Sequence, residues 1–233
     1  MLCWILTNIY VPNQPFPGRV RAMRIMKDAA IFAAALLLFI SSSLHAEDEL
    51  PIPTDDYVYC TVCHGVQLMG NSVIGAPRLS QMEDWYVERQ LQAFKKGWRG
   101  THDADKAGIE MQPMAAALSD EQIKEVTSFV IRTRSEQPMG TVRGGISRGR
   151  HHYTTCAACH GDEGQGNEAL GGPALTNVND WYLVRQLQNF RDGSRGAHPD
   201  DSYGNQMRAA TQILADDEAI NDVVSYIATF KNN

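Results

Sequence analysis

The sequence has 233 residues, of which 43% are hydrophobic and 21% are charged, and its formal net charge is −6. This length allows one large domain or two small ones, and the composition is that of a globular protein rather than of a disordered chain. The negative charge argues against binding to nucleic acid, because that function needs a basic surface.

The first 46 residues are typical of a secretory signal. Four basic residues between positions 19 and 27 precede the apolar run Ala29 to Ile40, and the small residue Ala46 ends the segment. The run is shorter than the roughly 20 apolar residues of a membrane span. We therefore predict a signal peptide at 1–46 and export to the periplasm, with a retained membrane anchor as the alternative. The residues before Met23 are not needed for such a signal, so the true start could be Met23 or Met26.

Removal of the signal would leave 17 basic and 26 acidic residues and a net charge of −9. The remaining sequence repeats itself with an offset of 96 residues. The segment DWYVERQLQAFKKGWRGTH at 84–102 matches DWYLVRQLQNFRDGSRGAH at 180–198, and only one inserted residue, near Ala215, is needed further on. We predict two similar domains, residues 47–138 and 139–233, with a linker rich in glycine and arginine at 134–150. Each predicted domain is small enough to need a covalent crosslink, a metal or a cofactor for stability.

The first predicted element of each copy is a helix that contains a CxxCH motif, at Cys60–His64 and at Cys156–His160. Thr54 or Asp55 would cap the first of these helices. Two cysteines three residues apart lie on one side of a helix, so both can form thioethers with the vinyl groups of one haem. The histidine that follows can then place an imidazole nitrogen on the iron.

Three alternatives compete for these cysteines: a redox pair, a zinc site and a disulfide. A thioredoxin-like redox pair needs a preceding strand, and no strand signal precedes either motif. A zinc site with four cysteines would leave the repeated histidines and methionines unexplained. We therefore predict two covalently bound haem c groups. The predicted thioether and iron-binding residues are Cys60, Cys63, Cys156, Cys159, His64 and His160.

A loop with glycine and proline follows each motif. Pro77 and Pro173 lie 13 residues after the motif histidine in both copies. A ligating imidazole usually donates its other N–H to a fixed acceptor, so these two carbonyl groups are candidates. The alternative is that both prolines only stiffen the loop.

The next helix is predicted to begin near Asp84 and to end at Gly97, with Val87, Leu91 and Phe94 on one face. Several of its other residues recur in the second copy and could line a haem pocket. The arginines suit haem propionates, whereas ordinary helix packing explains the aromatic residues equally well. The repeated residues are Trp85, Tyr86, Arg89 and Gln90, and Trp181, Tyr182, Arg185 and Gln186.

A repeated methionine precedes the last helix of each copy, in what we predict to be a loop. Met111 and Met207 each lie 47 residues after the motif histidine, and Met207 is the only methionine after the second motif. We predict this pair as the second axial iron ligands. Core filling is one alternative, and ligation by the repeated His102 and His198 is another.

The last helix is predicted to begin at Ser119, which forms a capping-box pattern with Gln122. Its apolar face contains Ile123, Val126 and Val130. The second copy repeats this face with Ile220, Val223, Val224 and Ile227. Strand signals are nearly absent, so the predicted fold class is all-α.

Together these residues resemble the two-haem class I cytochromes c of the cytochrome c4 type. The resemblance covers about residues 50–231 and depends on the CxxCH motifs, the P-x-L after each, the W-Y-x-x-R-Q-L-Q-x-F helix and the methionine stretch that begins at Met111. The second copy departs from this stretch at Ala210 and Ala215, but Met207 stays in register. The resemblance implies two cytochrome c domains packed face to face and Met111 as an axial ligand.

The resemblance also implies electron transfer in the periplasm between a membrane quinol-oxidising complex and a terminal oxidase. An iron bound by histidine and methionine has no position left for a substrate, so we predict a one-electron carrier rather than an enzyme, without a small-molecule substrate. The alternatives are a haem subunit of an oxidase or dehydrogenase complex, a sensor of O₂ or NO, and a dihaem peroxidase. Membrane association would come through a partner or an uncleaved signal.

Overall fold

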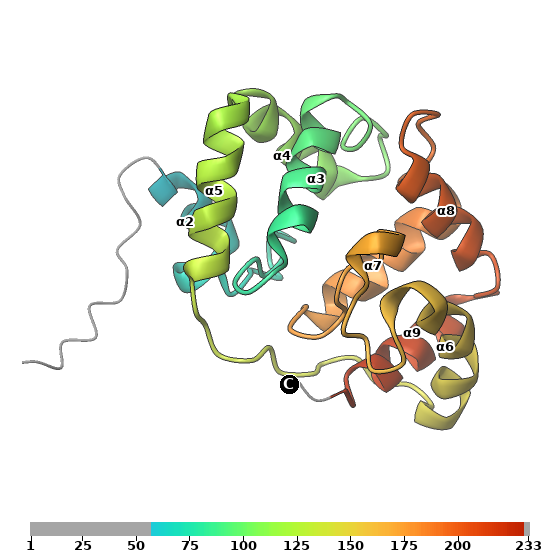
Figure 1. Ribbon diagram of the computed structural model, residues 1–233. Coiled ribbons are helices and arrows are strands. Elements are labelled where there is room, and N and C mark those ends of the chain that lie inside the picture. The colour runs from blue at the N-terminus through green and yellow to red at the C-terminus, as the bar shows by residue number, and fades with distance from the viewer. Residues whose placement is uncertain (1–56, 231–233) are drawn as a thin grey trace, which may run out of the picture. The chain divides into compact units, whose positions relative to one another are not determined.

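The computed structural model describes residues 57–230, and helices are its regular elements, which confirms the all-α prediction (Figure 1). The first half has α2 (Val58–His64), η2 (Val66–Leu68), α3 (Asp84–Lys95), α4 (Lys106–Ala116) and α5 (Asp120–Arg132). The second half has α6 (Ile146–His160), η3 (Glu168–Leu170), α7 (Asp180–Asp192), α8 (Ser202–Thr211) and α9 (Asp217–Ile227). Each half therefore has the same order of elements.

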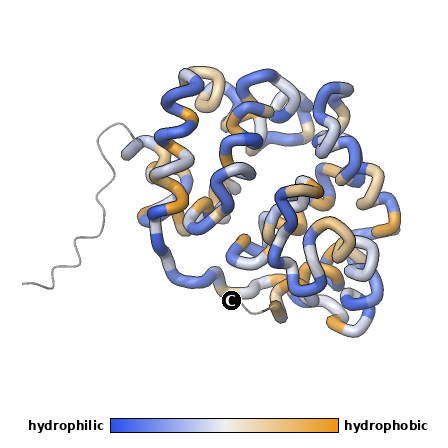
Figure 2. The backbone as a smooth tube through the Cα atoms, in the orientation of Figure 1, coloured by the Kyte–Doolittle hydropathy of each residue, from blue (hydrophilic) through white to orange (hydrophobic). Residues whose placement is uncertain are grey.

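The core of the first half lies between α3 and α5. Both helices are amphipathic, and the tube of α5 alternates between hydrophilic and hydrophobic residues (Figure 2). The predicted capping box is present, because Ser119 Oγ accepts from Gln122 N and the Gln122 side chain accepts from Ser119 N. The buried residues of these two helices include those predicted from the pattern, Val87, Leu91, Phe94, Ile123, Val126 and Val130.

The core of the second half is built mainly from α6 and α9. Tyr153 of α6 lies against Tyr226 and Phe230, with ring centroids 5.6 and 5.0 Å away. The N-cap of α9 is Asp216, whereas the N-cap of α5 is Ser119. Since these two caps are 97 rather than 96 residues apart, the structure contains the extra residue that the sequence alignment placed near Ala215.

The linker is attached to the second half by Asp180, the first residue of α7. Its carboxylate accepts hydrogen bonds from the backbone N–H of Thr141, from Thr141 Oγ1 at 2.9 Å and from Val142 N at 2.6 Å. The equivalent residue of the first half, Asp84, is exposed and accepts from Trp85 N. The same residue type thus has an additional role in the second half, where the chain must be brought to α6.

Replacement of Asp222 with asparagine is expected to lower the free energy of unfolding by about 2 kcal/mol at neutral pH. The Asp222 side chain is 1% exposed, and its carboxylate accepts from Arg148 Nε at 2.5 Å and from the backbone N–H of Gly145. The hydrogen bond from Arg148 is the largest influence on the pKa of Asp222 and, against desolvation, holds it below its usual value. Because the pKa of Asp222 is lower in the folded than in the unfolded protein, its ionised carboxylate stabilises the fold. This contribution is complete above the unfolded-state pKa of about 4 and is lost as the pH falls through the folded-state pKa.

The difference in free energy of unfolding between the unmodified protein and the Asp222→Asn variant should therefore shrink below about pH 4. Denaturant titrations at neutral and acid pH can measure it. Asp217→Asn is the matched control, because Asp217 begins the same helix but is 62% exposed in its pair with Arg191. Little change is expected from that control. An effect of Asp222→Asn that stays constant with pH would contradict the argument.

The two halves contact each other at positions that the 96-residue repeat relates. Asn179 Oδ1 accepts from Arg78 N at 2.7 Å, and Glu83 Oε2 accepts from Ala174 N at 2.7 Å. Position 83 corresponds to 179, and 78 corresponds to 174, so each contact is the counterpart of the other. All the described residues belong to one compact unit.

One prediction is wrong and others lie outside the described residues. Met111 and Met207 are in α4 and α8, not in loops. Asp105 and Asp201 act as the N-caps of these helices. The helices were not predicted because their short, polar sequences lack a clear apolar periodicity. The predicted signal at 1–46 and the cap at position 54 or 55 fall outside residues 57–230. Within residues 57–230, no helix is long and apolar enough to cross a membrane.

Candidate haem sites

Each CxxCH motif occupies the C-terminal end of a helix, α2 or α6. Cys60 and Cys156 are half-buried, Cys63 and Cys159 are exposed, and no disulfide joins any of the four. Burial raises the pKa of Cys60 and raises the pKa of Cys156 to about 11. Reactive cysteines of redox pairs have lowered pKa values, so Cys60 and Cys156 differ from the cysteines of such pairs. Among residues 57–230, no three side chains of His, Cys, Asp or Glu converge as a metal site would require.

The motif histidines are oriented by the two prolines of the following loops. His64 Nδ1 lies 2.7 Å from Pro77 O, and His160 Nδ1 lies 2.7 Å from Pro173 O. A carbonyl oxygen can only accept, so Nδ1 bears the proton and Nε2 keeps its lone pair. Burial lowers the pKa of both histidines, although the proline carbonyls oppose this effect. Both side chains are therefore neutral imidazoles prepared for a metal at Nε2.

The loop between histidine and proline returns to the helix end in the same way in both halves. Gly70 N donates to His64 O at 2.8 Å, and Gly166 N donates to His160 O at 2.8 Å. Gly70 has φ +90°, and a Cβ there would lie 2.6 Å from Arg78 N. Glycine is required at this turn because a side chain has neither the space nor the favoured backbone conformation.

Met111 and Met207 are half-buried, and Met111 packs against the core of the first half. The repeated pattern Asp-x-x-Gly positions their helices. Asp105 Oδ1 accepts from Gly108 N at 3.0 Å, and Asp201 Oδ1 accepts from Gly204 N at 2.9 Å. A Cβ on Gly108 would lie 2.1 Å from Asp105 Oδ2. This pattern was visible in both copies and could have predicted the two helices.

Replacement of Asp105 with alanine is expected to cost about 1 kcal/mol of stability, because the first turn of α4 loses its cap. Asp105 is buried, whereas its neighbour Asp103 is exposed. The control Asp103→Ala should therefore leave stability nearly unchanged. Thermal unfolding of the two holoprotein variants measures both values. Equal midpoints would show that the cap does not hold the helix of Met111.

The alternative histidine ligands are placed in surface turns. His102 Nδ1 accepts from Ala104 N at 3.2 Å, and His198 Nδ1 accepts from Asp200 N at 3.2 Å. His198 also stacks on Trp98, with ring centroids 5.9 Å apart. These contacts give both histidines a structural role, and the choice of the methionine pair as the second ligands stays a prediction.

Two buried arginines that sequence reasoning did not single out form the centre of the contact between the halves. Arg99 donates to Gln90 Oε1, to Tyr182 OH and to Gln186 Oε1 at 3.0, 3.1 and 3.0 Å. Its repeat partner Arg195 mirrors this set, donating to Gln186 Oε1, Tyr86 OH and Gln90 Oε1 at 2.6, 3.4 and 2.7 Å. The two glutamines each accept from both arginines, which closes a ring. We call Arg99, Gln90, Arg195 and Gln186 the arginine–glutamine ring.

The ring concentrates positive charge away from solvent. Arg99 and Arg195 are 7% and 6% exposed, and the acceptors named above are neutral oxygens. Burial raises the pKa of Tyr182, but the guanidiniums of Arg99, Arg195 and Arg185 outweigh it and lower that pKa below its usual value. An uncompensated buried charge is costly, so this interface is suited to an anion. Arg99 and Arg195 are related by the 96-residue repeat, and this recurrence in the sequence could have identified them.

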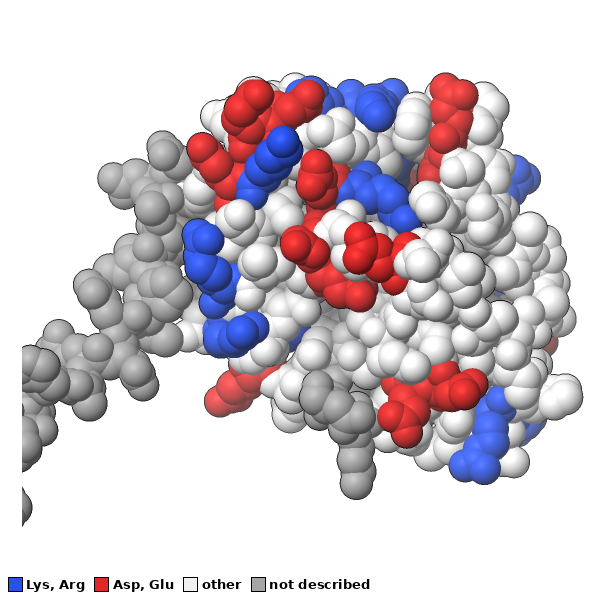
Figure 3. Space-filling view, in the orientation of Figure 1, with Lys and Arg blue, Asp and Glu red and all other residues white. Residues whose placement is uncertain are grey.

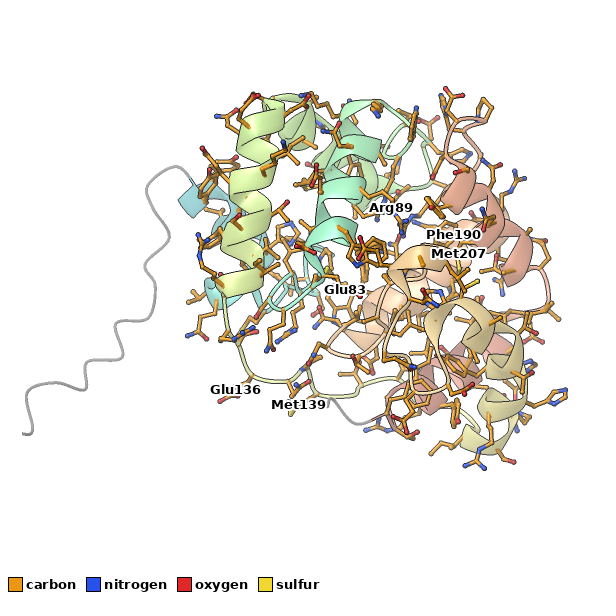
Figure 4. The ribbon with its side chains drawn as sticks, in the orientation of Figure 1. Glu83, Arg89, Glu136, Met139, Phe190 and Met207 are labelled. Carbon is orange, nitrogen blue, oxygen red and sulfur yellow. The ribbon has the colours of Figure 1, made fainter. Side chains whose placement is uncertain are left out.

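The predicted pocket arginines reach across to the loop of the opposite half. Arg89 donates to Gly171 O at 2.7 Å, and Arg185 donates to Gly75 O. The Arg89 guanidinium also lies over the rings of Trp85 and Tyr203, 4.6 and 4.3 Å from their centroids, so α3 contacts α8 there (Figure 4). The haem-pocket roles of Trp85, Tyr86 and Arg89, and of their counterparts, stay predictions.

The residues present fit a covalently bound haem in each half. Each half offers two thiols on a helix, a neutral imidazole fixed at Nδ1 and a half-buried thioether on another helix. Haem c also brings two carboxylates, and the buried guanidiniums of the arginine–glutamine ring are paired with neutral groups. Arg99 Nε has no hydrogen-bond partner among the described residues. The ring could therefore accept the carboxylates without displacing an existing ion pair.

Comparison with known proteins gives consistent matches. The family model "Cytochrome c" matches residues 57–133 and again residues 146–231. A thiosulfate dehydrogenase electron acceptor of Stutzerimonas stutzeri strain A1501 is 34% identical over 72% of this chain and 77% of its own length. Cytochrome c4 of Stutzerimonas stutzeri is 28% identical over 69% of this chain and 80% of its own.

A likeness in fold accompanies these matches. The crystal structure of reduced recombinant cytochrome c4 from Pseudomonas stutzeri has a TM-score of 0.60 and 24% sequence identity, with 76% of this chain and 95% of that chain covered. The two matches to the family model span most of the described residues, one in each half.

Proposed function

The chain belongs to the cytochrome c family, with one cytochrome c domain in each half, and from this premise we propose that it carries single electrons between a membrane quinol-oxidising complex and a terminal oxidase or reductase. The two CxxCH motifs in two such domains imply two haem c groups, so the protein is a dihaem electron carrier. The signal-like segment at 1–46 supports a periplasmic location.

The observation that supports this function is the repetition of one ligand geometry. Each half has a buried neutral histidine, His64 or His160, held at Nδ1 by a proline carbonyl. Each half also has a half-buried methionine, Met111 or Met207, in register with the other. We infer that these four side chains are the axial ligands. When bound, haem supplies a one-electron change at iron, and two protein ligands leave no position for a substrate.

The protein then has to hold the redox centre, exclude water and keep the two centres close. We infer that the arginine–glutamine ring pairs with propionates of the two haems, because its buried guanidiniums donate to neutral acceptors from both halves. Charge pairing at one shared ring would also fix the two domains relative to each other. This inference adds Arg99 and Arg195 as propionate-binding residues to the pair predicted from the sequence, Arg89 and Arg185.

A second donor is supported by the match to a thiosulfate dehydrogenase electron acceptor. In that case the protein would accept electrons from a thiosulfate dehydrogenase rather than from a quinol-oxidising complex. Both alternatives use the same haem sites. Purification of the protein with its bound partner from membranes or from the periplasm would separate a complex subunit from a free carrier.

An optical redox titration of the holoprotein tests the proposed carrier. Two low-spin haems, both with positive potentials and with the weak near-infrared band of methionine bound to Fe(III), are expected. A high-spin haem, or turnover of hydrogen peroxide at a substantial rate, would instead favour a dihaem peroxidase. Absence of the near-infrared band with both haems low-spin would favour bis-histidine ligation by His102 and His198.

A further inference from the structure

The surface around the first CxxCH motif differs from its counterpart in the second half. Residues 57–77 contain no Lys, Arg, Asp or Glu, whereas residues 153–173 contain Asp162, Glu163 and Glu168. On the face that Figure 3 shows, acidic and basic side chains are interspersed. The equivalent segment of the second half is charged, so the uncharged stretch is specific to the first half. Besides Tyr59, five large apolar side chains are exposed in it, Val62, Val66, Met69, Val73 and Ile74, and we call these five the apolar patch.

The fold itself does not require these apolar side chains. The equivalent positions in the second half are also exposed, but they hold smaller or polar residues at four of the five places. These residues are Ala158, Asp162, Gln165, Ala169 and Leu170. Since the same turn forms with either set, the turn itself does not require the apolar residues of the first half, whose number in one short segment is what calls for an explanation.

The apolar patch adjoins the attachment point of the first haem. Val62 directly precedes the exposed Cys63, and Val66 follows His64 by two residues. The hydrogen bond from Gly70 N to His64 O, 2.8 Å long, folds the rest of the loop back onto the end of α2. A protein that covers the patch would therefore lie directly against the residues that hold this haem.

The size of the apolar patch matches a transient redox contact. Val62, Val66 and Val73 are 74, 75 and 92% exposed. With the other two side chains they present an apolar area on the order of 500 Å², as large as the largest patch on a typical monomer. Weak electron-transfer complexes bury less than about 1,200 Å² in total, whereas obligate dimers bury about 2,000 Å² or more. The area is thus sufficient for a redox encounter and too small for a stable dimer of this chain.

We propose that the apolar patch is the docking face for a redox protein whose own cofactor edge is surrounded by uncharged, apolar residues. This proposal rests on the proposed electron-carrier function. Burial of apolar surface drives the association, so its rate depends little on ionic strength. A second copy of this chain is a poorer occupant, because two mature chains of net charge −9 repel each other.

The test is electron transfer from the reduced holoprotein to a small blue-copper protein that has an uncharged, apolar face over its copper. The variant Val62→Ala/Val66→Asp/Met69→Gln gives the first half the residues of the second, so it is expected to fold. Its second-order rate constant should fall at least tenfold. The variant Val66→Asn/Met69→Gln, which adds no charge, should show a similar fall. Leu170→Asn, an apolar-to-polar change at the equivalent surface of the second half, should not.

Controls separate the docking proposal from the carrier function. Oxidised ferrocenemethanol, a small mediator, should oxidise all these proteins at similar rates, and their potentials should agree. Failure of the unmodified holoprotein with this mediator would instead overturn the carrier function. Unchanged rates with the blue-copper protein in both patch variants would overturn the docking face. A dimer in sedimentation that the patch variants abolish would also overturn it.

Discussion

Replacement of Met207 with leucine is expected to remove about half of the near-infrared band of the oxidised protein, because one of the two haems loses its thioether ligand. That haem should become high-spin, should have a lower potential and should bind carbon monoxide when reduced. Met111→Leu should do the same for the other haem, and the double variant should lose the band completely. Absorption spectra and carbon monoxide titrations measure all three variants.

The matched control for this prediction is Met114→Leu. Met114 is on the same helix as Met111, is 44% exposed and has no methionine counterpart in the second half. Its replacement should leave the band at full intensity. A full band in Met207→Leu, or a loss in Met114→Leu, would show that the ligand assignment is wrong.

Replacement of Arg78 with alanine is expected to destabilise the protein by about 3 kcal/mol, since it leaves several buried carbonyl and amide oxygens without donors. The Arg78 side chain is fully buried, and burial lowers its pKa, although the guanidinium stays charged. Its acceptors belong to its own loop, to the linker and to the second half. They are Ser80 O, Gln81 Oε1, Ser135 Oγ, Ser135 O and Asn177 O.

The effect of Arg78→Ala should appear in the docking of the two halves rather than in haem attachment. The second half has Ala174 at the equivalent position, so a cytochrome c domain of this type does not need an arginine there. Proteolysis near Ser135 should become faster, whereas the haem content should stay at two per chain. Arg78→Lys should recover only part of the stability, because an ammonium cannot reproduce the planar fork of five donors.

Arg134→Ala is the control for the loss of an arginine near this junction. Arg134 is exposed, and its side chain donates to Ile131 O at 3.4 Å. A change within about 0.5 kcal/mol is expected there. If Arg78→Ala unfolds at the same denaturant concentration as the unmodified protein, its hydrogen bonds across the junction contribute little.

Much of the local structure could be predicted from the sequence because each signal is short-range. The capping box at Ser119 and the apolar faces of α3 and α5 follow from helical spacing, and the structure confirms them. The internal repeat made the second half a check on the first, which is how one inserted residue near Ala215 could be located. The helices of Met111 and Met207 were missed, because their caps lie in segments with weak apolar periodicity.

By itself, the sequence determined the all-helical class, the duplication and the two haem-attachment motifs, because these depend on residues that are neighbours in the chain or that recur at a constant offset. Only the tertiary structure decided how the halves meet. Arg99 lies 83 residues from Tyr182, and Arg78 lies 99 residues from Asn177. No periodicity relates such positions, since the partner of each side chain depends on which faces of two folded domains come together.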